Sequence, residues 1–375
     1  MNAGPAAHRT VVADVRVFDG EKLLEPGTVV IDGTVIGTAA DADGARRIDG
    51  RGGVLLPGLI DTHVHLTDLS TLRAFASYGV TTVLDMGTWP AEKVDALRGR
   101  TGLTDIRSAT VGATSPDSAH GQRLRPEGGL VGGPDEAEGY VDRRVAEGAD
   151  YIKIIIDLPG FDQATVDALV AAAHRHGMRT VVHASSLEAF RMAQHAGADV
   201  LTHAPLDRPV TEEDVARALA GHRVVSPTLA MMEAIVAAVG RPGAPGPSYE
   251  AARASVAALH RAGVPILAGS DANDAKGVPA TPPFGDSLHR ELELLTGAGL
   301  STVEALRAAT VVAARCFGLT DRGVIEPGRR ADLLLVSGDP VADIRATRNV
   351  ERVWCAGVEF DASRPNASRP NEDRR

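Results

Sequence analysis

The sequence is poor in cysteine, aromatic residues and positive charge, and each shortage excludes a class of protein. Its two cysteines, Cys316 and Cys355, lie far apart without CxxC spacing, so we expect buried, reduced thiols of a cytoplasmic protein and no disulfide framework. Aromatic residues make up 3% of the chain, which argues against a pocket that stacks nucleobases or large rings. The formal net charge of -10, without a stripe of Lys and Arg, argues against a nucleic-acid partner.

Long apolar runs are also missing from the chain. No segment approaches the ~18 uninterrupted apolar residues that a membrane span needs. The first residues, MNAGPAAHRT, lack the charged lead and apolar core of a secretory signal. Hydrophobic residues, at 44% of the chain, are still numerous enough for a sizeable core. We therefore expect a cytoplasmic protein without a membrane or nucleic-acid partner, and we leave open whether it forms a homo-oligomer.

Most of the chain alternates short apolar runs with Ala- and Leu-rich helical stretches. The apolar runs predict strands at 55–63, 80–86, 105–113, 149–157, 179–185, 199–204, 223–229 and 264–271. Glycines such as Gly79, Gly148 and Gly263 stand just before a strand, where helix terminators are expected. Eight consecutive strand–helix units predict an α/β fold of the TIM type, a (β/α)8 barrel, because parallel strands need crossover helices.

The two ends of the chain show β-like alternation broken by Gly and Asp turns. We expect residues 10–56 to form a small antiparallel sheet that the C-terminal part completes, giving a small β-sandwich domain built from both termini. The predicted domains are residues 57–320 for the barrel and residues 1–56 with 321–360 for the small domain. Residues 361–375 are poor in apolar side chains and are expected to be a disordered tail.

Residues that are metal ligands, or can become so, close the predicted strands. They are His63 and His65 in LIDTHVHL, Lys153 in YIKIIID, His183 in TVVHASS, His203 in VLTHAP and Asp271 in LAGSDAN. Because side chains alternate along a strand, His63 and His65 point the same way, about 7 Å apart along the backbone, which suits one cation. A parallel barrel gathers its active site at the carboxyl ends of its strands. The pattern therefore predicts a metal-dependent hydrolase.

Each of these residues alone has a simpler interpretation. A single lysine at a strand end is usually solvated or ion-paired, and a single strand histidine is usually a hydrogen-bonded structural residue. The constellation, and not any one member, favours a metal centre. Asp61, two residues before His63, points to the same face, where it either orients a ligand or terminates the strand.

Several motifs together resemble the amidohydrolase superfamily over nearly the whole chain. They are LLPGLIDTHVHL, the lysine in GADYIKI, VVHA, LTHAP, LAGSDA and GLTDRGVIEPGRRADLLLVSGDP. More narrowly, they look like the imidazolonepropionase-related branch that contains metal-dependent Xaa-Pro dipeptidases. The resemblance implies two divalent metal ions, taken as zinc. It assigns His63, His65 and Asp271 to one ion and His183 and His203 to the other. N-carboxylated Lys153 would bridge the two.

The charges explain why such a lysine would be modified. An ammonium group beside two divalent cations would be repelled, whereas a carbamate supplies two hard oxygens and one negative charge. In the scheme that the resemblance implies, a metal-bridging hydroxide attacks the scissile carbonyl, and Asp271 passes the proton to the leaving amine. The expected reaction is hydrolysis of an amide C–N bond in a small molecule such as an N-acyl amino acid or dipeptide.

Other functions remain open from the sequence. A mononuclear deaminase or imidazolone-type hydrolase commonly lacks the bridging lysine and needs an acidic residue after the fifth-strand histidine, where Glu188 stands in HASSLE. A lactonase or carbamate-ester hydrolase would use the same attack on a C–O acyl bond. A non-catalytic scaffold is disfavoured because all the ligands remain.

The glycine-rich segment 115–133 has the character of an active-site loop. Its His120 is, with Asp271, a predicted catalytic residue, because relatives often carry a histidine near the substrate in a GHG-like setting. In this chain Ala119 replaces the first glycine. Charged loop residues are usually just solvated. Further candidates for substrate contact are Arg123, Arg125, Lys276, His289, Met231 and Met232.

Overall fold

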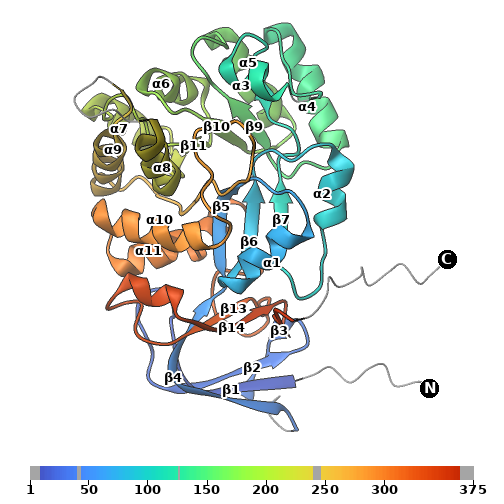
Figure 1. The fold of residues 1–375 in the computed structure, drawn as a ribbon, viewed down its shortest axis with the longest axis vertical. Coiled ribbons are helices and arrows are strands. Elements are labelled where there is room, and N and C mark those ends of the chain that lie inside the picture. Colours follow the sequence, from blue (N-terminus) through green and yellow to red (C-terminus); the bar gives the residue numbers. More distant parts are fainter. Residues whose placement is uncertain (1–8, 40–43, 126, 240–245, 364–375) are drawn as a thin grey trace, which may run out of the picture.

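The computed structural model describes residues 9–39, 44–125, 127–239 and 246–363. Parallel strands surrounded by helices form the larger part of the molecule, and a smaller sheet lies below them in the view of Figure 1. In the part of the chain that is described, no helix is long and apolar enough to cross a membrane.

Two parallel sheets form the centre of the larger part. One contains β5 (Leu59–Val64), β6 (Val80–Asp85) and β7 (Asp105–Ser108), and the other contains β8 (Ala113–Thr114), β9 (Ile152–Ile155), β10 (Thr180–His183), β11 (Val200–Thr202) and β12 (Val224–Val225). Isolated parallel bridges join Val225 to Ile266 and Val64 to Ala272, so segment 266–272 connects the two sheets. Strands β5 and β6 are buried along their whole length, as expected for parallel strands covered on both faces. The predicted α/β class with parallel strands is confirmed.

Two of the predicted strands are irregular. Strand 105–113 is divided into β7 and β8, and segment 264–271 makes only an isolated bridge instead of a ladder. Thr110 and Asp271 have left-handed backbone conformations, with φ of 57° and 56°, which break an extended ladder. The break at Asp271 therefore falls on one of the six predicted metal ligands.

Helices follow the strands and cover the parallel sheets (Figure 1). They are α1 (Leu69–Ser77), α2 (Ala91–Leu97), α3 (Ala119–Leu124), α4 (Ala137–Ala146), α5 (Gln163–Arg175), α6 (Leu187–Ala196), α7 (Glu212–Ala220), α8 (Leu229–Val239), α9 (Tyr249–Arg261), α10 (Asp286–Gly297), α11 (Thr302–Ala308) and α12 (Val311–Cys316), with 3-10 turns η2 (Pro134–Glu136) and η3 (Ile344–Arg348). Gly79, Gly148 and Gly263 have φ of 76°, 73° and 88°, so they end their helices in the left-handed conformation predicted for them.

The chain ends combine into one seven-stranded sheet. It contains β1 (Arg9–Val17), β2 (Gly27–Asp32), β3 (Val35–Ile36), β4 (Arg46–Pro57), β13 (Leu333–Val336), β14 (Val350–Cys355) and β15 (Val358–Glu359), in the order β15-β14-β13-β4-β1-β2-β3. The prediction of a wholly antiparallel sheet for residues 10–56 was wrong, because β1 pairs with β4 in parallel. The connection between them includes β2 and β3 and is long enough for a parallel return. The predicted tail lies outside the described residues except for 361–363.

Candidate functional site

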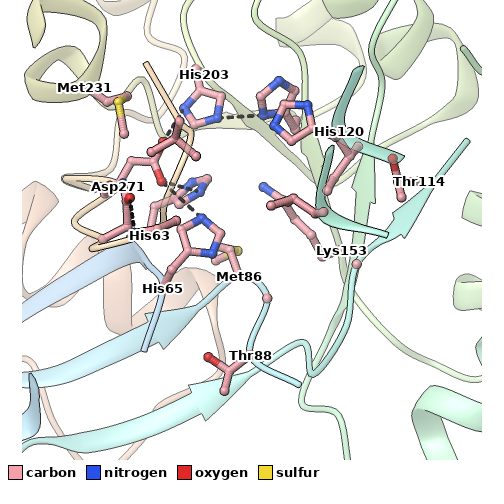
Figure 2. A pocket seen from close by; sticks show the side chains of 18 of the residues that line it. His63, His65, Met86, Thr88, Thr114, His120, Lys153, His203, Met231 and Asp271 are labelled. Carbon is pink, nitrogen blue, oxygen red and sulfur yellow. Dashed lines mark hydrogen bonds and ion pairs between the residues drawn. The ribbon is translucent and has the colours of Figure 1, made fainter. Parts of the chain in front are cut away.

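The six predicted ligands meet at the carboxyl ends of the parallel strands. His63 lies near the end of β5, Lys153 within β9 and His183 at the end of β10. His65 and His203 directly follow β5 and β11, and Asp271 directly precedes the bridge residue Ala272. Figure 2 shows His63, His65 and Asp271 on one side of the pocket, with the Lys153 amine pointing toward them from the other. All six line one pocket of about 460 Å³.

One carboxylate faces two of the histidines. Asp271 Oδ1 lies 3.5 Å from His63 Nε2 and 3.2 Å from His65 Nε2. His63, His203 and Asp271 offer ligand atoms that all lie within 4.8 Å of one another. Imidazole nitrogens and a carboxylate are suitable ligands for zinc. The cluster therefore has the composition and spacing of a site for one divalent cation.

A second pair of nitrogen atoms lies beside the first cluster. His203 Nε2 and His183 Nδ1 are 2.8 Å apart. Lys153 Nζ, which is buried, has no hydrogen-bond partner among the described residues. Burial of a polar group without a partner costs about 1–3 kcal/mol or more. An orphaned amine among ligand-type side chains fits a residue that is modified or compensated by a bound group.

Electrostatics favour uncharged side chains in this cluster. Burial lowers the pKa of Lys153 to about 7, although nearby Asp271 raises it. Burial, and then the Lys153 charge, lower the pKa of His63 and of His203 well below the ordinary imidazole value. Neutral imidazole is the form that binds metals, so the site holds its histidines ready for ligation.

Two threonines orient the histidines from outside the cluster. His63 Nδ1 lies 2.9 Å from Thr202 Oγ1, and His203 Nδ1 lies 2.5 Å from Thr228 Oγ1. Each contact occupies one ring nitrogen and turns the other toward the pocket. Sequence reasoning missed both threonines, because a threonine at a strand end looks like any β-branched strand residue.

Asp61 holds the backbone around the site. Its carboxylate accepts hydrogen bonds from Ser270 Oγ at 2.5 Å, from Ser270 N at 2.9 Å and from His63 N at 3.2 Å. Burial raises the pKa of Asp61 to about 7. Strand β5 continues to Val64, so Asp61 does not terminate it. The carboxylate instead ties β5 to the segment that carries Asp271.

His120 lies in α3 at the pocket and pairs with a carboxylate that sequence reasoning missed. Asp157 Oδ2 accepts from His120 N at 2.8 Å and lies 2.8 Å from His120 Nδ1. Although burial raises it, the contacts with His120 hold the pKa of Asp157 below its usual range. The His120 ring centroid is 5.0 Å from that of His183. The predicted active-site loop therefore does bring a histidine to the ligand cluster.

The outer walls of the pocket are largely apolar. They include Leu66, Met86, Trp89, Leu124, Leu206, Met231, Met232, Ile235 and Val278. Both methionines suggested by the sequence line the pocket. Trp89 does so as well, and sequence reasoning had not singled it out.

Only some of the other candidates reach the pocket. Arg123 lines it, and so does Lys93, which the sequence did not single out; both are exposed. Arg125, Lys276 and Glu188 are exposed and are not among the described residues of its lining. His289 is buried elsewhere, where both its ring nitrogens are engaged.

Comparisons with known proteins identify the family of the chain and proteins that share its fold. The model of the amidohydrolase family matches residues 54–359. The chain is 30% identical to an imidazolonepropionase of Ectopseudomonas mendocina over 419 residues, which cover 92% of this chain and 96% of that protein. It is 26% identical to an adenine deaminase of Bacillus licheniformis over 96% of this chain, but spans only 61% of that protein's length. A crystal structure of a Xaa-Pro dipeptidase with bound methionine shares the fold, with a TM-score of 0.80 and 24% identity over 94% of this chain and 100% of that chain.

Proposed function

Since the chain belongs to the amidohydrolase family, we propose that it is a hydrolase that cleaves an amide C–N bond of a small molecule at a centre for two divalent metal ions. Zinc is the ion that we propose. The observation that carries the proposal is the convergence in one pocket of four histidines, an aspartate and the buried amine of Lys153, which has no hydrogen-bond partner in the described part of the chain.

The residues present fit such a centre. We assign His63, His65 and Asp271 to one ion, His183 and His203 to the other, and N-carboxylated Lys153 to both. The buried amine supports this assignment, because conversion to a carbamate would replace an uncompensated group with two oxygen ligands. When bound, divalent ions lower the pKa of water and polarise a carbonyl.

Two side chains, Asp271 and His120, act on the water and the substrate in this proposal. In the proposed mechanism, Asp271 accepts a proton from the attacking water and delivers it to the leaving nitrogen, the usual role of a positioned carboxylate. Its Oδ1 already faces the pocket beside His63 and His65. His120, on the other side of the pocket, contacts the substrate through its free ring nitrogen.

The pocket supports an N-acyl amino acid or dipeptide with an apolar group as the substrate. Trp89, Met231 and Met232 supply an apolar wall, and a volume of about 460 Å³ is within the usual range for small ligands. Arg123 and Lys93 stand at the same pocket and suit a substrate carboxylate. Because both are exposed, we expect them to contribute more to orientation than to affinity.

A mononuclear deaminase is less well supported. The acidic residue that it would need, Glu188, is exposed on α6 and does not line the pocket in the described structure. A lactone or carbamate-ester substrate would use the same residues, and no particular contact favours it. A scaffold without activity is disfavoured because all six ligands are assembled.

We also propose the predicted barrel, the predicted terminal domain and the predicted location. Bridges from segment 266–272 to β5 and β12 support a (β/α)8 barrel over residues 57–320. The sheet shared by residues 9–56 and 321–360 supports a small terminal domain, proposed as a β-sandwich. The two cysteines are unpaired and buried, in keeping with the proposed cytoplasmic location.

Metal quantification combined with a substrate panel tests the function. Zinc-reconstituted protein should hold about two ions per chain and release amino acid from N-acyl amino acids or dipeptides with apolar groups. A chelator should abolish this activity and zinc should restore it. One ion per chain with ammonia released from adenine would establish the deaminase instead. Absence of bound zinc would refute the metal centre.

A further inference from the structure

Asp157 lies two residues beyond the end of β9 and faces two histidines of the pocket. Its Oδ2 contacts both the backbone N and the ring Nδ1 of His120 at 2.8 Å, while its Oδ1 lies 4.0 Å from Nε2 of His183. The Asp157 side chain is only 14% exposed. One carboxylate therefore lies between a residue proposed to contact substrate and a residue proposed to bind metal.

We propose that Asp157 is a positioning residue that fixes the ring tautomers of both His120 and His183. An ionised carboxylate only accepts hydrogen bonds, so Nδ1 of His120 must carry the proton. In the neutral ring, Nε2 then has a free lone pair. Asp157 thus determines which nitrogen His120 presents to a substrate.

The same reasoning applies to the ring tautomer of His183. This part of the argument rests on the proposed function, because it takes His183 as a metal ligand. Its Nδ1 points at His203 Nε2, 2.8 Å away, and is the nitrogen placed to bind metal. The proton of a neutral ring must then lie on Nε2, which is buried and has no hydrogen-bond partner among the described residues. Asp157 is 4.0 Å away, so a closure of about 1 Å would produce a hydrogen bond.

Close packing brings Asp157 to this position. A Cβ added to Gly160 would lie 3.1 Å from Ser118 Cβ and 2.6 Å from the Asp157 carbonyl oxygen, so the 157–160 turn packs directly on the residue that caps α3.

The bond from His120 N to Asp157 also satisfies a backbone donor in the first turn of α3. A simpler role for Asp157 is therefore helix capping alone. Asn caps helices about as well as Asp, so Asp157→Asn separates the two roles.

The tautomer of His120 can be measured without any substrate. In ¹⁵N spectra of the imidazole rings at about pH 8, where an ordinary imidazole is neutral, the signals of His120 are identified by their loss in His120→Gln. We expect the Nδ1–H tautomer in the wild type. In Asp157→Asn we expect a shift toward Nε2–H, because a carboxamide can donate to Nδ1. Asp162→Asn, which alters the exposed capping residue of α5, is the matched control and should leave the ring unchanged.

Zinc affinity, measured by competition with a chelator, tests the contact with His183. Loss of a group that orients a ligand typically lowers metal affinity about 10–100-fold, and we expect this loss in Asp157→Asn. His120→Gln and Asp162→Asn should bind zinc like the wild type. An unchanged His120 tautomer or an unchanged zinc affinity in Asp157→Asn would overturn the proposal and leave Asp157 as a helix cap. If the wild type bound no zinc, the proposed function would fail, while the spectra would still decide the contact with His120.

Discussion

At the scale of single residues, the site depends on the buried amine of Lys153. We predict that Lys153→Ala loses zinc and activity together, with activity falling about 10²-fold or more, because the shared ligand is removed. Short carboxylates added to the solution should restore part of both by replacing the missing oxygens. Zinc content and rate are measured on the same samples, with Lys22→Ala, which alters an exposed lysine outside the described pocket lining, as control. Two zinc ions and full activity in Lys153→Ala would refute the bridging role.

Asp271 has two proposed roles, ligation and proton transfer. Asn keeps the size of the side chain and one coordinating oxygen but cannot carry the proton. We predict that Asp271→Asn lowers kcat about 10²–10⁴-fold while most of the zinc stays bound. The loss should be smaller on an activated ester, whose leaving group needs little protonation. Asp274→Asn, which alters an exposed carboxylate in the same pocket, should retain its rate. Near wild-type turnover of Asp271→Asn with both ions bound would remove this residue from the mechanism.

The sequence indicates the six candidate ligands but not the residues that orient them. The ligands end apolar strand-like runs, and parallel strands bring their carboxyl ends together, so spacing along the chain translates directly into proximity. Asp157 and Thr228 act through contacts between neighbouring strand ends and loops. Those contacts depend on how loops pack, and hydrophobic periodicity carries no information about that packing.

At the scale of elements, regular segments were predictable and the irregular ones lie at the site. Strands β6, β9 and β10 fall inside predicted runs and β5 exceeds its run only by Val64, because buried parallel strands are continuous apolar stretches. The predicted strand 264–271 does not form a regular ladder. The backbone of Asp271 is left-handed, and the preceding Ser270 is hydrogen-bonded to the Asp61 carboxylate. Departures from regular structure are common where a segment positions a functional side chain, and Asp271 is a candidate for such a role.

His289 of α10 joins three elements and makes their packing sensitive to acid. Its Nδ1 contacts Thr347 Oγ1 of η3 at 2.9 Å, and its Nε2 donates to the Tyr78 carbonyl after α1 at 3.0 Å. Burial lowers the pKa of His289 to about 4, although the bond to Tyr78 raises it. The folded protein therefore keeps this ring neutral at pH values where the unfolded chain has protonated it.

The sign of the pH dependence follows from this lowered pKa. Stability from neutral His289 is fully present above about pH 6.5 and is lost as the pH falls toward 4, since the unfolded state then binds the extra proton. We predict that between about pH 7 and pH 5 the wild type loses about 2 kcal/mol more unfolding free energy than His289→Gln. Urea unfolding of both proteins at each pH measures the difference, because the other histidines are common to both. Parallel pH profiles would contradict the prediction.

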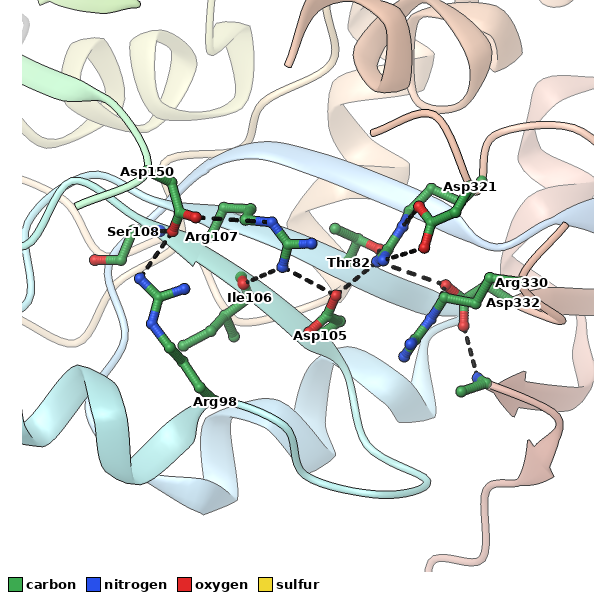
Figure 3. Close-up of polar contacts among 12 residues, drawn as sticks. Thr82, Arg98, Asp105, Ile106, Arg107, Ser108, Asp150, Asp321, Arg330 and Asp332 are labelled. Atoms are coloured by element: carbon green, nitrogen blue, oxygen red, sulfur yellow. Dashed lines mark hydrogen bonds and ion pairs between the residues drawn. The ribbon is translucent and has the colours of Figure 1, made fainter. Parts of the chain in front are cut away.

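At the scale of the whole molecule, one arginine connects the parallel sheets to the terminal sheet. Arg322 Nη1 donates to Asp105 Oδ2 of β7 at 2.8 Å and lies 3.7 Å from Asp332, the residue before β13. Figure 3 shows these carboxylates in one network that continues to Arg107 and Asp150. The Arg322 side chain is 3% exposed. Sequence reasoning did not identify this network, because its members lie far apart in the chain and share no pattern.

The final prediction concerns this connection between the two parts of the molecule. Removal of one partner from a buried ion pair typically costs about 3–5 kcal/mol, because a buried charge is left uncompensated. Asp105 and Asp332 retain Arg107 and Arg330 as partners, so we expect Arg322→Met to lose about 3 kcal/mol, at the lower end of that range. Adding Asp105→Asn should recover part of the loss, since it removes one of the two carboxylate charges that Arg322 no longer compensates. Arg345→Ala, which breaks an exposed ion pair with Asp343, should have little effect in the same urea titration. If Arg322→Met were as stable as Arg345→Ala, the joint between the two parts would depend on apolar packing rather than on this buried network.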